Sequence, residues 1–467
     1  MEKDNVLSEL IYEYYKSRIC FGIYKYGDQL KSVSQLCASF GLARNTVQTA
    51  LNKLEEKGYI RTEQRRMARV IYQGNPKIFK ENAEKYFVPR RDGLRDINQW
   101  GQFLFSPIWE KGIKNIEQSP PDSMYGKQDL MMFEATKLYY DALDTLNNRL
   151  MSSLYWQLLR YLNYFYPDEE YETDNCLEDG RFSIVKANEM KQKMDSYYSG
   201  IYSQVENFVD SIYRTYHPED VEQIPFTWTI YRKRPQVRYT LASTILREIL
   251  WGVYPLGSYL PSLPQMAEQY QVSLITVRRT LDVLHTFGVT NTYKGVGTQV
   301  CLEPIDPNIL STPEIRENLL LYGEGIEFFA LTVHNVTFYT LESIPRDKRE
   351  VLLQKIGNLC DKRSSILCMD VLLNFISTEA PSALFRECYG KLRELMTWGY
   401  VFYAILKKTG EQQDNDLAGF ITQLETNLKA DNLTAFAGQW QSFIEDRLKL
   451  FRSKILLWDS QKKAQYE

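Results

Sequence analysis

The chain has 467 residues, of which 44% are hydrophobic and 25% are charged, and its formal net charge is −3. These values are typical of a globular protein of about three domains, which excludes the disordered and fibrous classes. No apolar run approaches the roughly 20 residues that span a bilayer, and residues 1–6 lack the basic and apolar stretches of a secretory signal.

Cysteine usage and the distribution of charge narrow the class further. The seven cysteines contain no CxxC pair, so we expect reduced thiols in a cytoplasmic protein rather than disulfides or a zinc site. Residues 1–73 carry 12 Lys and Arg against 8 Asp and Glu, and residues 230–303 carry 8 against 4. The rest of the chain is acidic. Two basic segments in an acidic chain predict two separate surfaces that face phosphate.

The first basic segment opens with an amphipathic helix, predicted over residues 6–19 from its apolar spacing. A turn between Gly22 and Gly27 ends it. A short second helix is predicted to begin near Ser32, whose hydroxyl can cap the exposed N–H groups of the first turn. A tight turn at residues 40–42 then leads into a third helix.

The third helix and a hairpin complete the segment. Val47, Leu51 and Leu54 are spaced i, i+4 and i+7, so one face of this helix is buried and the other is free. Gly58 is expected to end the helix in the left-handed conformation. Residues 59–62 and 68–72 predict the two strands of the hairpin.

The same pattern recurs 230 residues later. Residues 22–70 align without a gap over residues 252–300, and 13 of the 49 positions are identical, glycines and apolar residues among them. The second copy therefore predicts a third helix that ends at Gly288 and a hairpin of residues 289–293 and 298–302. Three helices and a hairpin form a winged helix-turn-helix, whose third helix fits the DNA major groove.

The second copy resembles the DNA-binding domain of the GntR family of bacterial regulators. The likeness rests on residues 260–267 (LPSLPQMA), 272–281 (VSLITVRRTL) and 295–300 (GVGTQV). The first copy is similar through residues 27–32 (GDQLKS), 42–51 (LARNTVQTAL) and 57–60 (KGYI). It departs from the family in lacking the proline before the serine of the second helix, and in lacking both glycines of the wing.

The resemblance implies DNA contacts at the start of the second and third helices and at the wing. The matching residues of the first copy are Ser32, Ser34, Arg44, Asn45, Thr46, Gln48, Gln64, Arg65 and Arg66, and those of the second are Ser262, Ser273, Thr276, Arg278, Arg279, Lys294 and Gly295. Arg suits guanine and Asn or Gln suits adenine, while hydroxyls and N–H groups hold phosphate.

The two copies differ at the base-reading positions, so two unequal half-sites are expected. Leu274 and Ile275 stand where the first copy has Arg44 and Asn45. Leu274 either contacts a thymine methyl group or packs inside the protein.

The two remaining stretches are periodic at helical spacing, which predicts a mainly α, internally duplicated fold. We name the expected domains winged module 1 (1–73), helical domain 1 (74–225), winged module 2 (226–303) and helical domain 2 (304–467). Both helical domains are expected to be all-α bundles.

Helical domain 2 resembles the ligand-binding (FCD) domain of the FadR branch of GntR regulators. The likeness rests on residues 366–374 (ILCMDVLLN) and the helices that follow. Many such domains hold a metal through one Asp and three His. Asn374 stands where the first His would follow Asp370, and Tyr140 stands there in helical domain 1, so we predict no metal and no cofactor.

Aromatic residues gather in helical domain 1, and two interpretations of them stay open. Tyr139, Tyr140, Tyr155 and Trp156 either line a pocket for a small-molecule effector or pack the helices against one another.

Together these features predict a transcription regulator that binds double-stranded operator DNA and is not an enzyme. Its two modules would act as a pseudo-dimer on half-sites about 34 Å apart, and the chain could also form a homodimer. The alternative is a plasmid or phage replication initiator with tandem winged helices. An enzyme is disfavoured because no Ser/His/Asp, Cys/His or paired-carboxylate motif and no Gly-rich phosphate loop is present.

Overall fold

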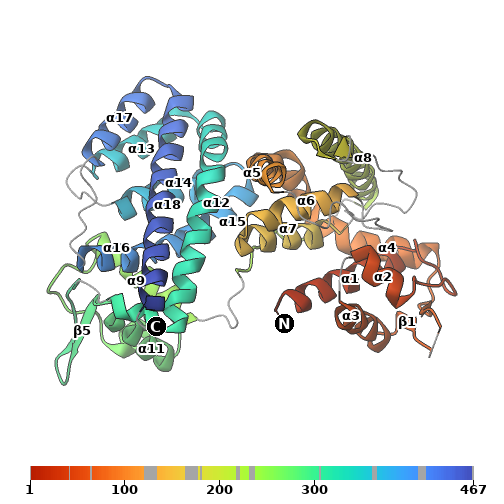
Figure 1. Cartoon of the computed structure of the whole chain (residues 1–467), viewed down its shortest axis with the longest axis horizontal. Coiled ribbons are helices and arrows are strands. Elements are labelled where there is room, and N and C mark those ends of the chain that lie inside the picture. Colours follow the sequence, from red (N-terminus) through yellow and green to blue (C-terminus); the bar gives the residue numbers. More distant parts are fainter. Residues whose placement is uncertain are drawn as a thin grey trace. The chain divides into compact units, whose positions relative to one another are not determined.

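The computed structural model describes residues 2–40, 43–63, 66–119, 134–163, 177–178, 181–216, 221–230, 237–303, 307–359, 365–408 and 417–464. The chain divides into two compact units, Met1–Thr227 and Trp228–Glu467. Each unit begins with three helices and a hairpin and continues into a helical domain (Figure 1). The predicted fold class, mainly α with a duplicated winged helix-turn-helix, is confirmed, whereas the four domain boundaries stay predictions.

Winged module 1 contains α1 (Glu2–Cys20), α2 (Val33–Phe40), α3 (Arg44–Glu56), β1 (Ile60–Arg61) and β2 (Arg69–Val70). The helices enclose a core to which the predicted apolar residues of α3 contribute. The hairpin is shorter than predicted. Its ladder ends at Arg61 because the next residue, Thr62, donates its backbone N–H to a carboxylate oxygen of Glu55, at 2.8 Å, instead of to the opposite strand.

Winged module 2 contains α9 (Val237–Leu250), α10 (Leu263–Gln269), α11 (Leu274–Thr286), β5 (Thr290–Tyr293) and β6 (Gly297–Val300). Its hairpin is longer and has four antiparallel pairs, from Thr290 with Val300 to Tyr293 with Gly297. This hairpin projects from the body of its unit (Figure 1). Tyr259, in the loop before α10, pairs with Gln299 in an isolated antiparallel bridge and so adds a third short segment to the hairpin.

Equivalent atoms make equivalent hydrogen bonds in the two modules. The N–H of Gly27 donates to the carbonyl oxygen of Val70 at 2.9 Å, and that of Gly257 donates to Val300 at 2.9 Å. A second pair of bonds is equivalent although the side chains differ. Arg69 donates to the carbonyl oxygen of Gly27 at 2.9 Å, and Gln299 donates to that of Gly257 at 2.8 Å. The structure therefore supports the 230-residue duplication residue by residue.

The paired glycines adopt the left-handed conformation in both modules, as predicted for Gly58 and Gly288. Their φ angles are +79° and +82° at Gly22 and Gly252, +93° and +83° at Gly27 and Gly257, and +75° and +62° at Gly58 and Gly288. Other residues are strained in this region because their Cβ approaches the backbone. The duplicated sequence thus preserves the glycines that its turns require.

Alanine should be less well tolerated at Gly288 than at Gly58. A Cβ at Gly288 would lie 2.9 Å from the carbonyl oxygen of Glu303, whereas one at Gly58 would have no neighbour within 4 Å. Gly58→Ala should cost about 1–2 kcal/mol from the left-handed conformation alone, and Gly288→Ala should cost more. Hydrogen exchange of the third helix and hairpin in each full-length variant measures both losses, and equal losses would contradict the role of the Glu303 contact.

Helical domain 1 contains α4 (Pro76–Phe87), η1 (Val88–Arg90), α5 (Arg91–Gln118), α6 (Glu134–Thr145), α7 (Arg149–Leu162) and α8 (Ile184–Tyr216). The helix α5 packs against α6 and α8, and the apolar side of α5, which includes Leu104 and Ile108, is buried. A short hairpin, β3 (Leu177–Glu178) with β4 (Arg181–Phe182), precedes α8 and departs from the all-α prediction. Two-residue strands are too short to produce a recognisable alternation in the sequence.

Helical domain 2 contains η3 (Pro307–Ser311), α12 (Pro313–Ser343), α13 (Arg346–Gly357), α14 (Ser365–Glu379), α15 (Ala383–Met396), α16 (Gly399–Lys408), α17 (Leu417–Lys429) and α18 (Leu433–Ala464). The two long helices α12 and α18 lie side by side (Figure 1). Large aromatic residues fill the core, Phe328, Tyr389 and Trp440 among them.

Within the described ranges, none of the helices is long and apolar enough to cross a membrane.

Candidate nucleic-acid interface

The third helix of winged module 1 has one buried face and one open polar face. Val47, Leu51 and Leu54 are buried, as their spacing predicted. On the opposite face Arg44 and Asn45 are exposed and Gln48 is half-buried. The side-chain amide of Gln48 donates to Asn52, one turn further along, at 2.9 Å. This face presents a guanidinium and three amides, which are the groups that hydrogen-bond guanine and adenine edges.

The third helix of winged module 2 has the same division but a different surface. Val277, Leu281 and Leu284 are buried. Leu274 and Ile275 are 46% and 62% exposed, so Leu274 does not pack inside the protein. Arg278 is exposed on the same face.

Arg279 is exposed at the edge of this face, toward helical domain 2. With Arg238, Asp282 and Thr312 it lines a pocket of about 160 Å³ between α9, α11 and the start of α12. Of the two predicted arginines on α11, Arg279 thus also contributes to this pocket, whereas Arg278 does not line it.

The predicted serines lie at helix starts, where they hold backbone N–H groups. Ser32 and Gln35 bond reciprocally before α2, at 2.9 and 3.2 Å. Ser262 forms the same capping box with Gln265 at α10. Ser273 caps α11 by accepting from the N–H of Thr276 at 3.1 Å. These caps orient the starts of the second and third helices, whose N-termini favour phosphate.

The structure describes the tip of the wing in module 2 but only part of the wing in module 1. In module 2, Lys294 and Gly295 are exposed at the tip, and Gly295 has a φ angle of +78°. In module 1, Arg66 is exposed and pairs with Glu63 at 2.9 Å, while Gln64 and Arg65 lie outside the described residues. Hydrogen bonds from the side chain and backbone of Thr62 lower the pKa of Glu55, and they anchor the beginning of this wing to the end of α3.

One predicted contact residue, Thr46, does not lie on the open face, although its contact with DNA stays a prediction, and two exposed positions were not predicted. Thr46 is only 4% exposed because its side chain lies on the buried side of α3, so it does not reach the open face. Ser34 is exposed on α2, as expected of a contact residue. Thr49 and Asn52 are exposed beside Gln48. Helical periodicity alone could have identified Asn52, which lies four residues after Gln48.

In unit 1 the third helix is linked to the helical domain through α1. A carboxylate oxygen of Glu9 lies 2.5 Å from Nζ of Lys53 on α3, and its other oxygen lies 3.8 Å from Arg160 on α7. Ser17 of α1 hydrogen-bonds Asn163, and Tyr86 of α4 donates to the carbonyl oxygens of Arg160 and Tyr161. A change in α7 therefore has a direct physical connection to α3.

In unit 2 a partly buried polar network lies between winged module 2 and helical domain 2. Asp370 of α14 accepts from Nε of Arg393 at 2.6 Å and from the indole N–H of Trp251 at 2.7 Å. Arg393 also donates to Asn374 at 2.6 Å, and Arg247 of α9 donates to Thr397 at 3.3 Å. Burial, followed by the nearby Arg393, lowers the pKa of Arg247. The network joins winged module 2 to helical domain 2.

The same network occupies the positions where the family pattern places metal ligands. Asp370 and Asn374 both bind the guanidinium of Arg393. No group of three or more His, Cys, Asp or Glu suited to a metal is found among the residues the structure describes. That the chain holds no metal stays a prediction.

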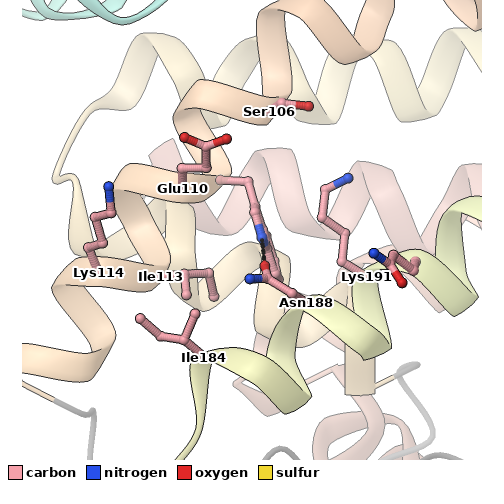
Figure 2. A pocket seen from close by; sticks show the side chains of 9 residues that line it. Ser106, Glu110, Ile113, Lys114, Ile184, Asn188 and Lys191 are labelled. Atoms are coloured by element: carbon pink, nitrogen blue, oxygen red, sulfur yellow. Dashed lines mark hydrogen bonds between the residues drawn. The ribbon is translucent and has the colours of Figure 1, made fainter.

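The aromatic residues proposed for an effector pack the helices together. Tyr139 stacks on Tyr155 with ring centroids 4.8 Å apart, and Tyr140 contacts Trp156. Tyr139 and Trp156 are buried. A pocket of about 440 Å³ lies beside this cluster between α5 and α8, but none of the four residues lines it (Figure 2). Sequence reasoning missed this pocket, since its lining residues come from two distant helices.

Comparison with known proteins identifies the winged modules. Residues 7–70 and 239–300 each match the family described as bacterial regulatory proteins, gntR family. The "Probable transcriptional regulator PhnF" of Escherichia coli is 33% identical over 86 residues, which are 18% of this chain and 36% of that protein. The "HTH-type transcriptional repressor STM4068" of Salmonella typhimurium is 38% identical over 60 residues, which are 13% of this chain and 25% of that protein. The matches thus span only about a third or less of either relative.

Two solved structures are similar at a lower level. Streptococcus agalactiae GntR is 16% identical, with 45% of this chain and 99% of that chain covered and a TM-score of 0.22. The Lar protein, described as controlling expression of the Listeria monocytogenes agr system, is 12% identical, with 48% and 99% covered and a TM-score of 0.22. At these scores the structures add nothing to the assignment, which rests on the two sequence matches. The match to the gntR family of bacterial regulatory proteins is thus confined to residues 7–70 and 239–300, the two winged modules.

Proposed function

We propose that this chain is a sequence-specific transcription regulator that reads two unequal DNA half-sites with the two winged modules of one polypeptide. The observation that carries the proposal is the pair of open faces on α3 and α11. Both third helices bury their apolar side and leave the other side exposed, and the exposed residues differ between the two. A winged helix-turn-helix places this face in the major groove.

The chemistry of each face predicts what it reads. In module 1, Arg44 suits the paired acceptors of guanine, and Asn45 and Gln48 suit adenine. In module 2, Arg278 supplies the guanine contact, while the exposed Leu274 and Ile275 suit thymine methyl groups. The helix starts and wings hold phosphate without reading sequence. The two half-sites are therefore expected to differ in base composition.

The relatives and the duplication support the remaining parts of the proposal. Both curated relatives are named as transcriptional regulators or repressors, and we extend that activity to this chain and place it in the cytoplasm as part of the proposal. Two modules in one chain act as a pseudo-dimer on one operator, and a second copy of the chain can add a further pair. A small-molecule effector bound in a helical domain would shift the orientation of the modules and so change the affinity for DNA.

Genome-wide binding of the purified full chain, followed by footprinting of the strongest site, tests this function. We expect sites at promoters, each protecting two dissimilar half-sites about one helical turn apart, and an affinity that falls steeply with salt. A single cluster of sites at a replication origin, or equal binding to unrelated DNA, contradicts the proposal.

A further inference from the structure

The pocket in helical domain 1 lies between α5 and α8. At one end the two helices are tied by ion pairs, from Arg95 to Glu206 at 2.8 Å and to Asp210 at 3.0 Å. Further along α5 stands Pro107, inside the helix. Proline lacks an N–H and presses on the preceding turn, which bends a helix. Residues on both sides of Pro107, from Ser106 to Lys114, line a pocket of about 440 Å³ between α5 and α8, a volume typical of small-molecule sites.

One wall of the pocket is a fixed indole. Trp109 is 3% exposed and stacks on Tyr139 with ring centroids 5.2 Å apart. Its N–H donates to the side-chain oxygen of Asn188 on α8, at 3.0 Å (Figure 2). The amide N–H₂ group of Asn188 makes no hydrogen bond with any other part of the described chain. The wall is thus rigid and apolar, with one amide donor beside it.

Side chains of opposite charge also line the pocket, beside this apolar wall. Glu110 and Lys114 line the pocket from α5, and Lys191 lines it from α8 (Figure 2). Lys191 is paired with Asp195 at 2.6 Å. Glu110 and Lys114 are four residues apart, a spacing that favours an ion pair, yet neither pairs with a described side chain. The pocket therefore offers one carboxylate and one ammonium that have no charged partner among the described side chains.

We propose that this pocket binds a small zwitterion of the amino-acid type, with an apolar or aromatic side chain. Its carboxylate would bind Lys114 and the amide of Asn188, its ammonium would bind Glu110, and its side chain would lie against Trp109. That this pocket is the effector site of the regulator rests on the function proposed above. Binding of the ligand itself requires no DNA.

The position of the pocket explains how such a ligand would reach the DNA-binding module. The helix α8 also packs against α4. Asn82 of α4 donates to the carbonyl oxygen of Cys20, the last residue of α1, at 2.9 Å, and to the hydroxyl of Tyr72 at 3.1 Å. A ligand that joins α5 to α8 therefore acts through α8 on α4, the helix that is bonded directly to winged module 1.

Calorimetric titration of the full chain tests the proposal with defined probes. Phenylalanine and leucine represent the zwitterion, while 2-phenylethylamine lacks the carboxylate and 3-phenylpropanoate lacks the amine. We expect at least one amino acid to bind with a Kd below about 1 mM and at least about tenfold more tightly than either phenyl analogue. Lys114→Gln should weaken amino-acid binding, whereas Lys111→Gln, an exposed lysine on α5 that does not line the pocket, should not.

Three results would overturn the inference: no binding of either amino acid, binding of either phenyl analogue as tightly as the amino acids, or equal losses in the two lysine variants. Operator binding is measured in parallel on the same protein. A chain that binds its operator but neither amino acid contradicts only the zwitterion site. A chain that binds an amino acid but no specific DNA contradicts only the regulatory function.

Discussion

Replacing Arg44 with alanine should weaken operator binding by about 5- to 150-fold, because a paired hydrogen bond to guanine contributes about 1–3 kcal/mol of discrimination. The loss should fall on one half-site only. In the Arg44→Ala variant, base changes in that half should no longer matter, while base changes in the other half keep their effect. Arg278→Ala should show the opposite pattern. Fluorescence anisotropy at fixed salt, with operators altered in one half at a time, measures both.

A charge control separates base reading from general attraction to DNA. Lys80→Ala removes one positive charge from the exposed surface of α4, outside the third helix of winged module 1, and should leave affinity and base preference nearly unchanged. If Arg44→Ala and Arg278→Ala weaken binding equally in both halves, or no more than Lys80→Ala does, the two helices do not read separate half-sites.

Asp370→Asn should destabilise unit 2 by about 3–5 kcal/mol, the usual cost of breaking a buried ion pair by removing one partner. The carboxylate is 8% exposed and accepts from both Arg393 and Trp251. The amide removes the negative charge and leaves the guanidinium of Arg393 without a counterion. Because the chain has more than one unit, hydrogen exchange of α14 and α15 in the full protein is the appropriate measurement.

Glu379→Gln provides the matched control for this substitution. Glu379 pairs with Lys348 at the surface of the same unit, and exposed pairs contribute about 0–1 kcal/mol. We therefore expect little change in exchange for this variant. If Asp370→Asn changed exchange no more than Glu379→Gln does, the Asp370 network would not hold winged module 2 to its helical domain.

The winged modules could be predicted from the sequence because their determinants are local. The glycine positions, the apolar spacing of α3 and α11 and the capping serines act over a few residues, and the duplication repeats each of them. The same apolar spacing predicted that the opposite face of each third helix is exposed. Thr46 was the exception, because a family pattern assigned it to DNA whereas its place on the helix turns it inward.

The features that depend on distant residues were not predictable in the same way. Trp251 and Asp370 are 119 residues apart, and no periodicity brings them together. The pocket beside Trp109 is formed by side chains of α5 and α8, nearly 80 positions apart. The aromatic cluster was recognised by composition, but only packing shows that its tyrosines support the wall of the pocket and do not line it.

The two helices proposed to read DNA are encoded by separate stretches of one gene, and this has an evolutionary consequence. In a symmetric homodimer every substitution appears twice, so a change that suits one half of a target disturbs the other. Here α3 and α11 can diverge independently, and Arg44 and Asn45 against Leu274 and Ile275 record how far they have done so. A mutation in one half of a promoter element can then be matched by a single codon change, without loss of fit at the other half.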